Sequence, residues 1–359
     1  MKVAFDHQIF TLQTYGGISR YFVRLAEELI AHQVDVNVLA SLHVNAYLKE
    51  LPVECARGWR VGRYPPKTTP LFIEVNRQLA ALKMRKFNPH ILHETYYSRK
   101  SVQGAAKGRI LTVYDMIHEK FASEFFDNDN TSKYKRDAVS RADHIICISH
   151  STKKDLCELF DVPSEKVTVV YLGFERFKDS LFNKVANQAT PPYLLYVGNR
   201  SGYKNFKMML KAVASSHELM KLFDIVAFGG GPFSTGEQQL ILELGFAPSA
   251  VRQISGDDSK LGMLYSNAAA FIYPSQYEGF GLPPLEAMAH GCPVVASNTS
   301  SIPEVVGMAG QYFDPADMDA LADAIVKVVF NEKRKSELVL NGNRRAYYHS
   351  KLTLIYVFH

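Results

Sequence analysis

The stretch EGFGLPPLEAMAHGCPVVAS, residues 278–297, decides how this chain folds. It follows an apolar run at 269–274 that is typical of a buried strand, and its Gly-Phe-Gly turn leads into helix-forming residues preceded by two prolines. A strand, a glycine turn and a helix N-terminus together form an anion site, because unpaired backbone N–H groups and the helix dipole point at one spot. Glu278 and Glu286 can accept hydrogen bonds from sugar hydroxyls beside that site. The pattern predicts a site for a nucleotide-sugar.

Short β-branched runs alternate with helical patterns through both halves of the chain. Strands are expected at 3–5, 34–39, 90–93, 110–114, 144–148 and 167–171, then at 194–197, 223–228, 251–254, 269–273 and 293–296, with helices at 19–31, 134–141, 207–214 and 316–331. This alternation predicts an α/β fold with parallel sheets covered by helices on both faces. At 359 residues the chain is long enough for two such Rossmann-like domains, which would face each other across a cleft. The polar segment 178–192 is the expected linker.

Composition indicates a globular protein of a reducing compartment. The chain is 47% hydrophobic and 21% charged, and its four cysteines form no Cys-x-x-Cys pair. We therefore expect buried, reduced thiols. The N-terminus lacks a signal-peptide pattern and no apolar run approaches the ~18 residues of a membrane span, so a cytoplasmic protein is expected.

The positive charge is concentrated in the first half of the chain. Residues 1–187 carry 27 Lys and Arg against 21 Asp and Glu, whereas residues 188–359 carry 14 against 15. The basic clusters are Arg57/Arg60/Arg63/Lys67, Lys83/Arg85/Lys86 and Lys133/Lys135/Arg136. They are either solvated helix faces or a surface for peripheral contact with an anionic membrane. Nucleic acid is not expected, because no nucleic-acid-binding motif accompanies the charge.

The whole string at 278–297 resembles the Glu-x7-Glu signature of the family 4 retaining glycosyltransferases of the GT-B fold, many of which are bacterial mannosyl- or glucosyltransferases. The resemblance implies an acceptor-side domain at 1–180 and a donor domain at 190–345. In such enzymes the last helix crosses back onto the first domain. Residues 346–359 could supply that crossing, although their β-branched composition suits a strand equally well.

On the donor side, the resemblance assigns roles to residues at the ends of second-half strands. Arg200 and Lys204 would bind the diphosphate and stabilise the leaving group in place of a metal. Glu286 would bind the ribose and Glu278 the donor sugar. Backbone amides of Phe280, Gly281 and Leu282 would contact the sugar and the distal phosphate. The base is expected near Arg252, Gln253 and Ile254, from their position in the fold alone.

On the acceptor side, the glycine pair Gly16-Gly17 would approach the diphosphate before a helix. TVYDMIHE, residues 112–119, resembles a segment of bacterial mannosyltransferase-like members, many of which have His-Asp where this chain has Tyr114-Asp115. Its His118 is the candidate that contacts the donor sugar near the reacting carbon. Asp115 and His93 are the candidates for acceptor contact. Asp127-Asn128-Asp129 has the form of a metal motif but follows no strand, so we interpret it as a solvated loop.

The resemblance implies transfer of a hexose with retention of configuration, needing neither a metal nor another cofactor. GDP-mannose is the first choice of donor, with a UDP-hexose such as UDP-glucose left open. The acceptor would be a glycan or a lipid-linked oligosaccharide of a surface polysaccharide. Two other classes stay open: a nucleotide-sugar epimerase or phosphorolytic enzyme on the same fold, and a non-catalytic sugar-binding module.

Overall fold

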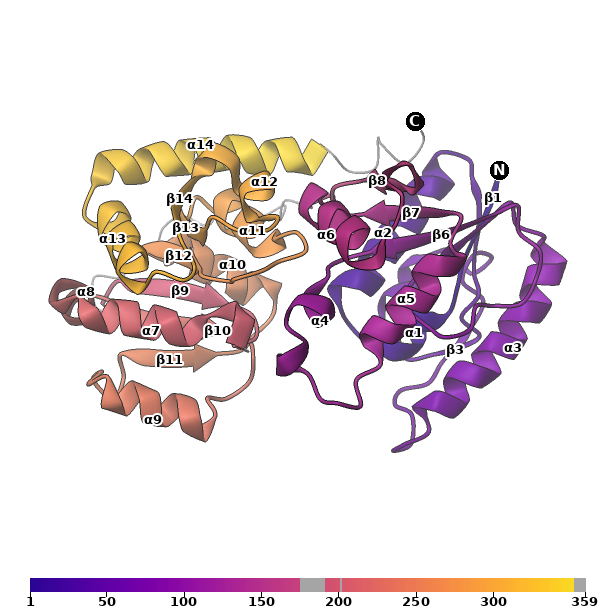
Figure 1. Ribbon diagram of the computed structural model, residues 1–359, viewed down its shortest axis with the longest axis horizontal. Coiled ribbons are helices and arrows are strands. Elements are labelled where there is room, and N and C mark those ends of the chain that lie inside the picture. Colours follow the sequence, from indigo (N-terminus) through magenta and orange to yellow (C-terminus); the bar gives the residue numbers. More distant parts are fainter. Residues whose placement is uncertain (175–190, 201, 352–359) are drawn as a thin grey trace.

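A computed structural model describes residues 1–174, 191–200 and 202–351, and it contains one six-stranded parallel sheet in each half of the chain (Figure 1). The first sheet has the order β2-β1-β5-β6-β7-β8, formed by β1 (Lys2–Phe5), β2 (Asp35–Val38), β5 (Ile91–Glu94), β6 (Gly108–Val113), β7 (His144–Cys147) and β8 (Val167–Val169). The second has the order β11-β10-β9-β12-β13-β14, formed by β9 (Tyr193–Val197), β10 (Asp224–Phe228), β11 (Val251–Ile254), β12 (Ala270–Tyr273), β13 (Val294–Ser297) and β14 (Gly310–Phe313). The predicted two Rossmann-like sheets are confirmed.

Helices cover both faces of each sheet (Figure 1). In the first half they are α1 (Gln8–Leu12), α2 (Gly17–Ala31), α3 (Thr69–Phe87), α4 (Ile117–Lys120), α5 (Thr131–Arg141) and α6 (His150–Phe160). In the second half they are α7 (Phe206–Ser215), α8 (His217–Leu222), α9 (Thr235–Glu243), α10 (Asp258–Asn267), α11 (Leu282–Ala289), α12 (Ile302–Val306), α13 (Met318–Val329) and α14 (Glu332–Lys351). None of these helices is both long and apolar enough to cross a bilayer, within the residues described.

The strands that decide the fold are buried on both faces. All four residues of β12 and of β13 are buried, as expected when helices cover both sides of a parallel sheet. The helices contribute one apolar face each: α2 buries Phe22, Leu25, Ala26 and Leu29, spaced three to four residues apart. At about 25 cal/mol per Å² of buried apolar surface, such faces supply most of the favourable folding free energy.

The end of the chain is helical as far as the structure describes it. α14 runs to Lys351 and packs on α11 and α13, while its His349 ring lies 6.2 Å from that of Tyr171 in the first half. The sequence left open a helix or a strand at this end of the chain, and the structure has a helix up to Lys351. Residues 352–359 lie outside the described residues, as does most of the expected linker, at 178–190.

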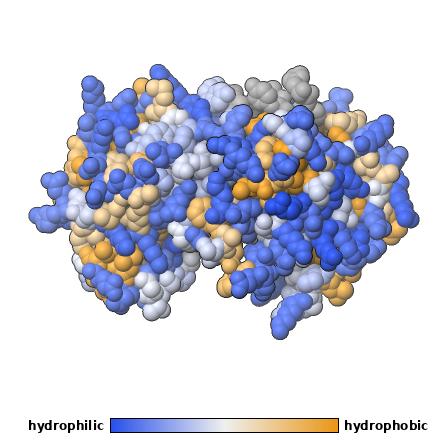
Figure 2. All heavy atoms as spheres, viewed as in Figure 1, coloured by the Kyte–Doolittle hydropathy of each residue, from blue (hydrophilic) through white to orange (hydrophobic). Residues whose placement is uncertain are grey.

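Polar contacts join the two halves at a few points. The Glu304 carboxylate of α12 accepts the backbone N–H groups of His150 and Ser151 at 2.8 and 2.7 Å, which places a negative charge at the N-terminus of α6. The Tyr277 hydroxyl donates to Asp155 at 2.7 Å. Elsewhere hydrophilic side chains cover most of the visible face, with apolar areas interspersed (Figure 2).

Candidate functional site

The turn after β12 lies against the first half of the chain. A Cβ at Gly279 would lie 1.9 Å from the Tyr114 carbonyl oxygen and 3.0 Å from the Asp115 Cβ. Gly281 has a φ of +121°, which side chains rarely adopt. Both glycines are therefore required, one for close approach between the halves and the other for the direction of the turn into α11.

Lys204 and Glu278 form a partly buried ion pair beside this turn. The Lys204 Nζ donates to both carboxylate oxygens of Glu278, at 2.7 and 2.8 Å, and the two side chains are 20% and 9% exposed. Burial alone would lower the pKa of Lys204, but the Glu278 carboxylate outweighs burial and raises it. The ammonium is thus charged throughout the neutral range. The structure brings these two predicted residues together although 74 positions separate them.

Glu286 faces a cavity of about 350 Å³ between the two halves. Gly16, Gly17 and Arg20 of α2 line the opposite side, and Leu282 lines it beside Glu286. Gly16 is the N-cap of α2, so that helix starts at the cavity; its Ser19 N–H donates to the Gln13 carboxamide oxygen at 3.3 Å. Burial raises the pKa of Glu286, while a 3.1 Å hydrogen bond from the Tyr265 hydroxyl opposes the rise. A carboxylate thus faces a helix N-terminus across a space of ligand size.

Asp115 borders the same region from the first half. Its carboxylate accepts the Ile117 N–H at 3.1 Å, and its negative charge contributes to the raised pKa of Lys204. Its backbone carbonyl accepts from Lys135, whose buried ammonium also pairs with Glu119 at 2.7 Å. Asp115 is therefore held at the junction with Lys204 and Gly279.

Two family models together match residues 15–345. The model described as Glycosyltransferase Family 4 matches residues 15–176, and the model described as Glycosyl transferases group 1 matches residues 177–345. The chain belongs to the family 4 glycosyltransferases. The predicted family and enzyme class are thereby confirmed, and the interpretation as a non-catalytic module is set aside.

Relatives and solved structures resemble this glycosyltransferase over most of its length. O-antigen chain mannosyltransferase B of Escherichia coli is 27% identical over 92% of the chain and 91% of the relative. The MMP alpha-(1->4)-mannosyltransferase of Mycolicibacterium hassiacum is 30% identical, over 56% of the chain and 49% of the relative. Sucrose-phosphate synthase from Thermosynechococcus elongatus superposes with a TM-score of 0.74 at 18% identity, covering 98% and 96% of the two chains. HepE of Anabaena, solved in complex with UDP, gives 0.71 at 17% identity, covering 98% and 96%. Both structures confirm the predicted GT-B fold.

Arg200 of the glycosyltransferase contacts the glycine loop after β10. Its guanidinium pairs with Glu237 at 2.6 Å and donates to the carbonyl oxygens of Gly229, Gly231 and Pro232 at 3.0 Å each. The side chain is only 5% exposed, so its donors are directed at protein groups. Burial opposes ionisation of Glu237, but Arg200 and Ser234 outweigh it and lower its pKa. Arg200 thus fastens the glycine loop after β10 to α9, and its predicted contact with phosphate stays a prediction.

His118 and His93 lie apart from the Glu286 cavity. His118 lines a separate cavity of about 450 Å³, stacks on Phe125 and lies 3.6 Å from Asp129. Its predicted contact with the donor sugar stays a prediction. His93 is buried against Phe5 and hydrogen-bonds Thr112 at 2.8 Å. Burial lowers its pKa to about 3, so the ring is neutral and belongs to the core. The predicted contact of His93 with the acceptor stays a prediction, which this core position does not support.

The three residues assigned to the base lie toward opposite ends of the neighbouring strand β10. Arg252 pairs at 3.0 Å with Asp224, the first residue of β10, and so points to the edge away from the glycine loop. Its assignment to the base stays a prediction, which this ion pair does not support. Gln253 donates to the Gly229 carbonyl at 3.2 Å, and the Ile254 carbonyl accepts the Gly229 N–H. Gln253 and Ile254 therefore lie near the glycine loop, at the end of the strand where the base is expected.

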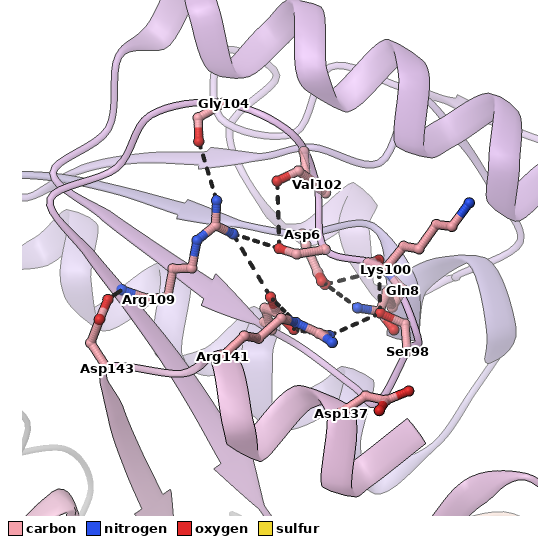
Figure 3. Close-up of polar contacts among 12 residues, drawn as sticks. Asp6, Gln8, Ser98, Lys100, Val102, Gly104, Arg109, Asp137, Arg141 and Asp143 are labelled. Carbon is pink, nitrogen blue, oxygen red and sulfur yellow. Dashed lines mark hydrogen bonds and ion pairs between the residues drawn. The ribbon is translucent and has the colours of Figure 1, made fainter. Parts of the chain in front are cut away.

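Buried charges support the loops at the carboxyl edge of the first sheet (Figure 3). Asp6, which follows β1, accepts from Thr95 and Gln8; burial raises its pKa although these hydrogen bonds oppose the rise. Arg141 donates to Glu94 at 2.6 Å and to Ser98 at 3.1 Å. These contacts hold the segments next to β1 and β5 in place without lining the cavity.

Sequence reasoning missed Tyr265, Glu237 and Glu304, whose roles depend on partners far away in the chain. No local pattern marks them; Glu237 alone has a signal, as the fourth residue of the capping box that begins at Ser234. Within the described ranges, no group of three or more His, Cys, Asp or Glu side chains could hold a metal. Asp127-Asn128-Asp129 forms a loop before α5, where Asp129 accepts the Thr131 N–H at 2.7 Å.

Proposed function

We propose that this glycosyltransferase moves a hexose from a nucleotide-sugar to a glycan or lipid-linked oligosaccharide, with retention of configuration. The observation that carries the proposal is the arrangement of Glu278 and Glu286 around the Gly279–Gly281 turn, with the N-terminus of α2 facing Glu286. Carboxylates accept hydrogen bonds from paired hydroxyls, so Glu278 suits the sugar and Glu286 the ribose. The helix N-terminus favours the diphosphate between them.

Lys204 supplies the positive charge for the departing diphosphate. Its ammonium is partly desolvated and oriented by Glu278, so it stabilises negative charge that grows in the transition state. We infer that the acceptor attacks from the same face as the leaving group, and that the diphosphate takes the acceptor's proton. Arg200 fixes the glycine loop, and we propose that it also stabilises the departing charge, as predicted from the sequence. The reaction is proposed to need no metal, because Lys204 and the helix N-terminus perform that electrostatic role.

Mannose from GDP-mannose is the proposed donor. The support is that curated relatives, including O-antigen chain mannosyltransferase B, are mannosyltransferases. A surface-polysaccharide acceptor is proposed as well, and its support is the two relatives named as O-antigen mannosyltransferases. A UDP-hexose is the second candidate, favoured by the likeness to HepE, whose structure contains UDP.

Calorimetric titration with GDP, UDP, GDP-mannose and UDP-glucose, with and without a chelator, tests the proposal. We expect micromolar binding of GDP and GDP-mannose that the chelator does not change. Lys204→Met should abolish turnover, whereas Lys207→Met, an exposed lysine on α7, should not. Preference for UDP would replace the donor, and loss of binding with the chelator would overturn the metal-free mechanism. An NMR spectrum of the product that shows inverted configuration would refute retention.

A further inference from the structure

The cavity of about 450 Å³ at His118 lies between α4, the start of α5 and the end of α6. His118 and Glu119 of α4 form part of its wall, together with the loop at 125–129 and Phe160 of α6. None of the described residues lines both this cavity and the one at Glu286. The His118 cavity is therefore a separate space of ligand size in the first half of the chain.

Two buried polar atoms in the wall of the His118 cavity lack a protein partner. The Glu119 side chain is 6% exposed, and its Oε2 accepts from Lys135 at 2.7 Å. Its Oε1 and the buried Nδ1 of His118 have no hydrogen-bond partner among the residues that the structure describes. A buried polar atom without a partner is costly, so a ligand that supplies the missing hydrogen bonds is favoured here.

Aromatic rings border the same cavity. Phe126 is 86% exposed, and Phe125 stacks on His118 with 4.1 Å between the ring centroids. The Arg136 guanidinium lies 4.0 Å from the centre of the Phe160 ring, also at the wall. One face of a hexose carries only C–H groups and packs on such rings, while its hydroxyl groups donate to carboxylates. Rings beside carboxylates are therefore a suitable surface for a sugar.

The charges at the His118 cavity favour a neutral sugar over an anionic ligand. Lys135 neutralises Glu119, which leaves Asp127 and Asp129 against Arg136 among the charged residues of the wall. A phosphate or a uronic acid would meet more negative than positive charge at this surface. A neutral hexose meets no such repulsion and uses the same carboxylates as hydrogen-bond acceptors.

The wall of the cavity is attached to the region around Asp115. Lys135, which pairs with Glu119, also donates to the Asp115 carbonyl at 2.9 Å. Farther along the same segment, Glu124 accepts the backbone N–H of Tyr203 in the second half at 3.1 Å. α4 is a single helical turn, about 5.4 Å long, on the side of the first half that faces the second sheet (Figure 1). A glycan whose terminal sugar lies at Asp115 can therefore extend to the cavity.

We propose that the His118 cavity is a subsite for a neutral hexose of the acceptor glycan, behind the sugar that receives the transferred hexose. Phe126 packs on the face of this hexose, and Glu119 and Asp129 accept hydrogen bonds from its hydroxyl groups. The subsite rests on the proposed function in one respect, because it takes the acceptor to be a glycan. It adds that the enzyme recognises more of the acceptor than its terminal sugar.

Calorimetric titration of the full chain with mannotriose, maltotriose and galactotriose tests the subsite. We expect at least one of these neutral trisaccharides to bind, and the anionic trigalacturonate to bind more weakly. Phe126→Ala should weaken that binding about tenfold, because the ring on which the hexose packs is lost. Met308→Ala is the matched control, since Met308 is also 86% exposed but lies in the second half, and it should leave the affinity unchanged.

Glu119→Gln should also weaken binding about tenfold, because a hydrogen bond to a carboxylate is stronger than one to an amide. Thermal unfolding of each variant controls for folding, since Glu119 also pairs with the buried Lys135. In steady-state kinetics, Phe126→Ala should raise the KM for the trisaccharide acceptor and leave the KM for the nucleotide-sugar unchanged.

Three outcomes would overturn the subsite: no binding of any of the three neutral trisaccharides, equal effects of Phe126→Ala and Met308→Ala, and tighter binding of trigalacturonate than of the neutral sugars. The proposed function fails separately. Trisaccharide binding that Phe126→Ala weakens, without transfer from any nucleotide-sugar, would refute the transfer reaction while the sugar-binding site stands. Transfer with unchanged acceptor affinity in Phe126→Ala would refute the subsite alone.

Discussion

Replacing Gly279 by alanine should separate the two halves of the enzyme without unfolding either one. The added Cβ would lie 1.9 Å from the Tyr114 carbonyl oxygen, whereas ordinary contacts begin at 3.4 Å. The turn and that carbonyl must therefore move apart by about 1.5 Å. Since a misplacement of 1 Å can cost about 100-fold in rate, we expect kcat/KM to fall at least about 100-fold, or roughly 2.7 kcal/mol.

The assay compares kcat/KM, thermal unfolding and small-angle scattering for the variant and for Gly236→Ala. Gly236 lies in α9, where a Cβ would meet nothing within 4 Å, so this control adds a methyl group without a clash. We expect the radius of gyration to rise and the melting temperature to change little in Gly279→Ala. Full activity in that variant would refute the conclusion that close approach of the turn to Tyr114 assembles the site.

Three further predictions concern residues that act at a distance from the cavity. Arg200→Lys should lower affinity for the nucleotide about tenfold or more in calorimetry, because an ammonium cannot reproduce four fixed hydrogen bonds; unchanged affinity would show that the glycine loop needs no fastening. Glu304→Gln should leave each sheet folded but make trypsin cut faster between the halves, since the N-terminus of α6 loses its carboxylate, and equal rates would contradict this role. His93→Gln should reduce acid sensitivity. The pKa of His93 is about 3 in the folded enzyme and about 6.5 in the unfolded chain, so the free energy of unfolding falls as pH falls through that interval, by about 1.4 kcal/mol per unit. Chemical denaturation at pH 4–6 measures this, and the same pH dependence in the variant and the unmodified enzyme would refute it.

The sheets could be predicted because parallel strands covered on both faces read as continuous apolar runs. β14 escaped prediction because its sequence, GQYF, begins with a glycine and a polar residue at the edge of the sheet. α3 escaped because it is a surface helix that buries only Asn76, Ala80 and Met84 while exposing charged residues. Burial on one narrow face leaves too weak an apolar pattern to mark a helix.

The candidate site could be predicted where its parts are local in sequence. The Gly279–Gly281 turn and both glutamates lie in one string, so their proximity follows from the chain itself. The partners of Arg200 lie 29 to 37 positions away, and a strand end with an arginine fits a phosphate as well as it fits a glycine loop. The contacts of Arg200 with Glu237 and with the glycine loop depend on how these distant segments pack. His93 illustrates the same limit, since alternate residues of a strand end point to the core or to the cleft.

The division of the site between two sheets makes the activity of the enzyme depend on how its two halves meet. Asp115 and the start of α2 come from one core, whereas Lys204, Glu278 and Glu286 come from the other. Apolar side chains of both halves, among them Tyr114 and Phe280, belong to one continuous buried cluster, and polar contacts such as that of Tyr277 with Asp155 add to it. Heating that parts the halves would therefore expose apolar surface on both and stop turnover in the same step. Inactivation in this enzyme thus reports the loss of a buried contact within one molecule.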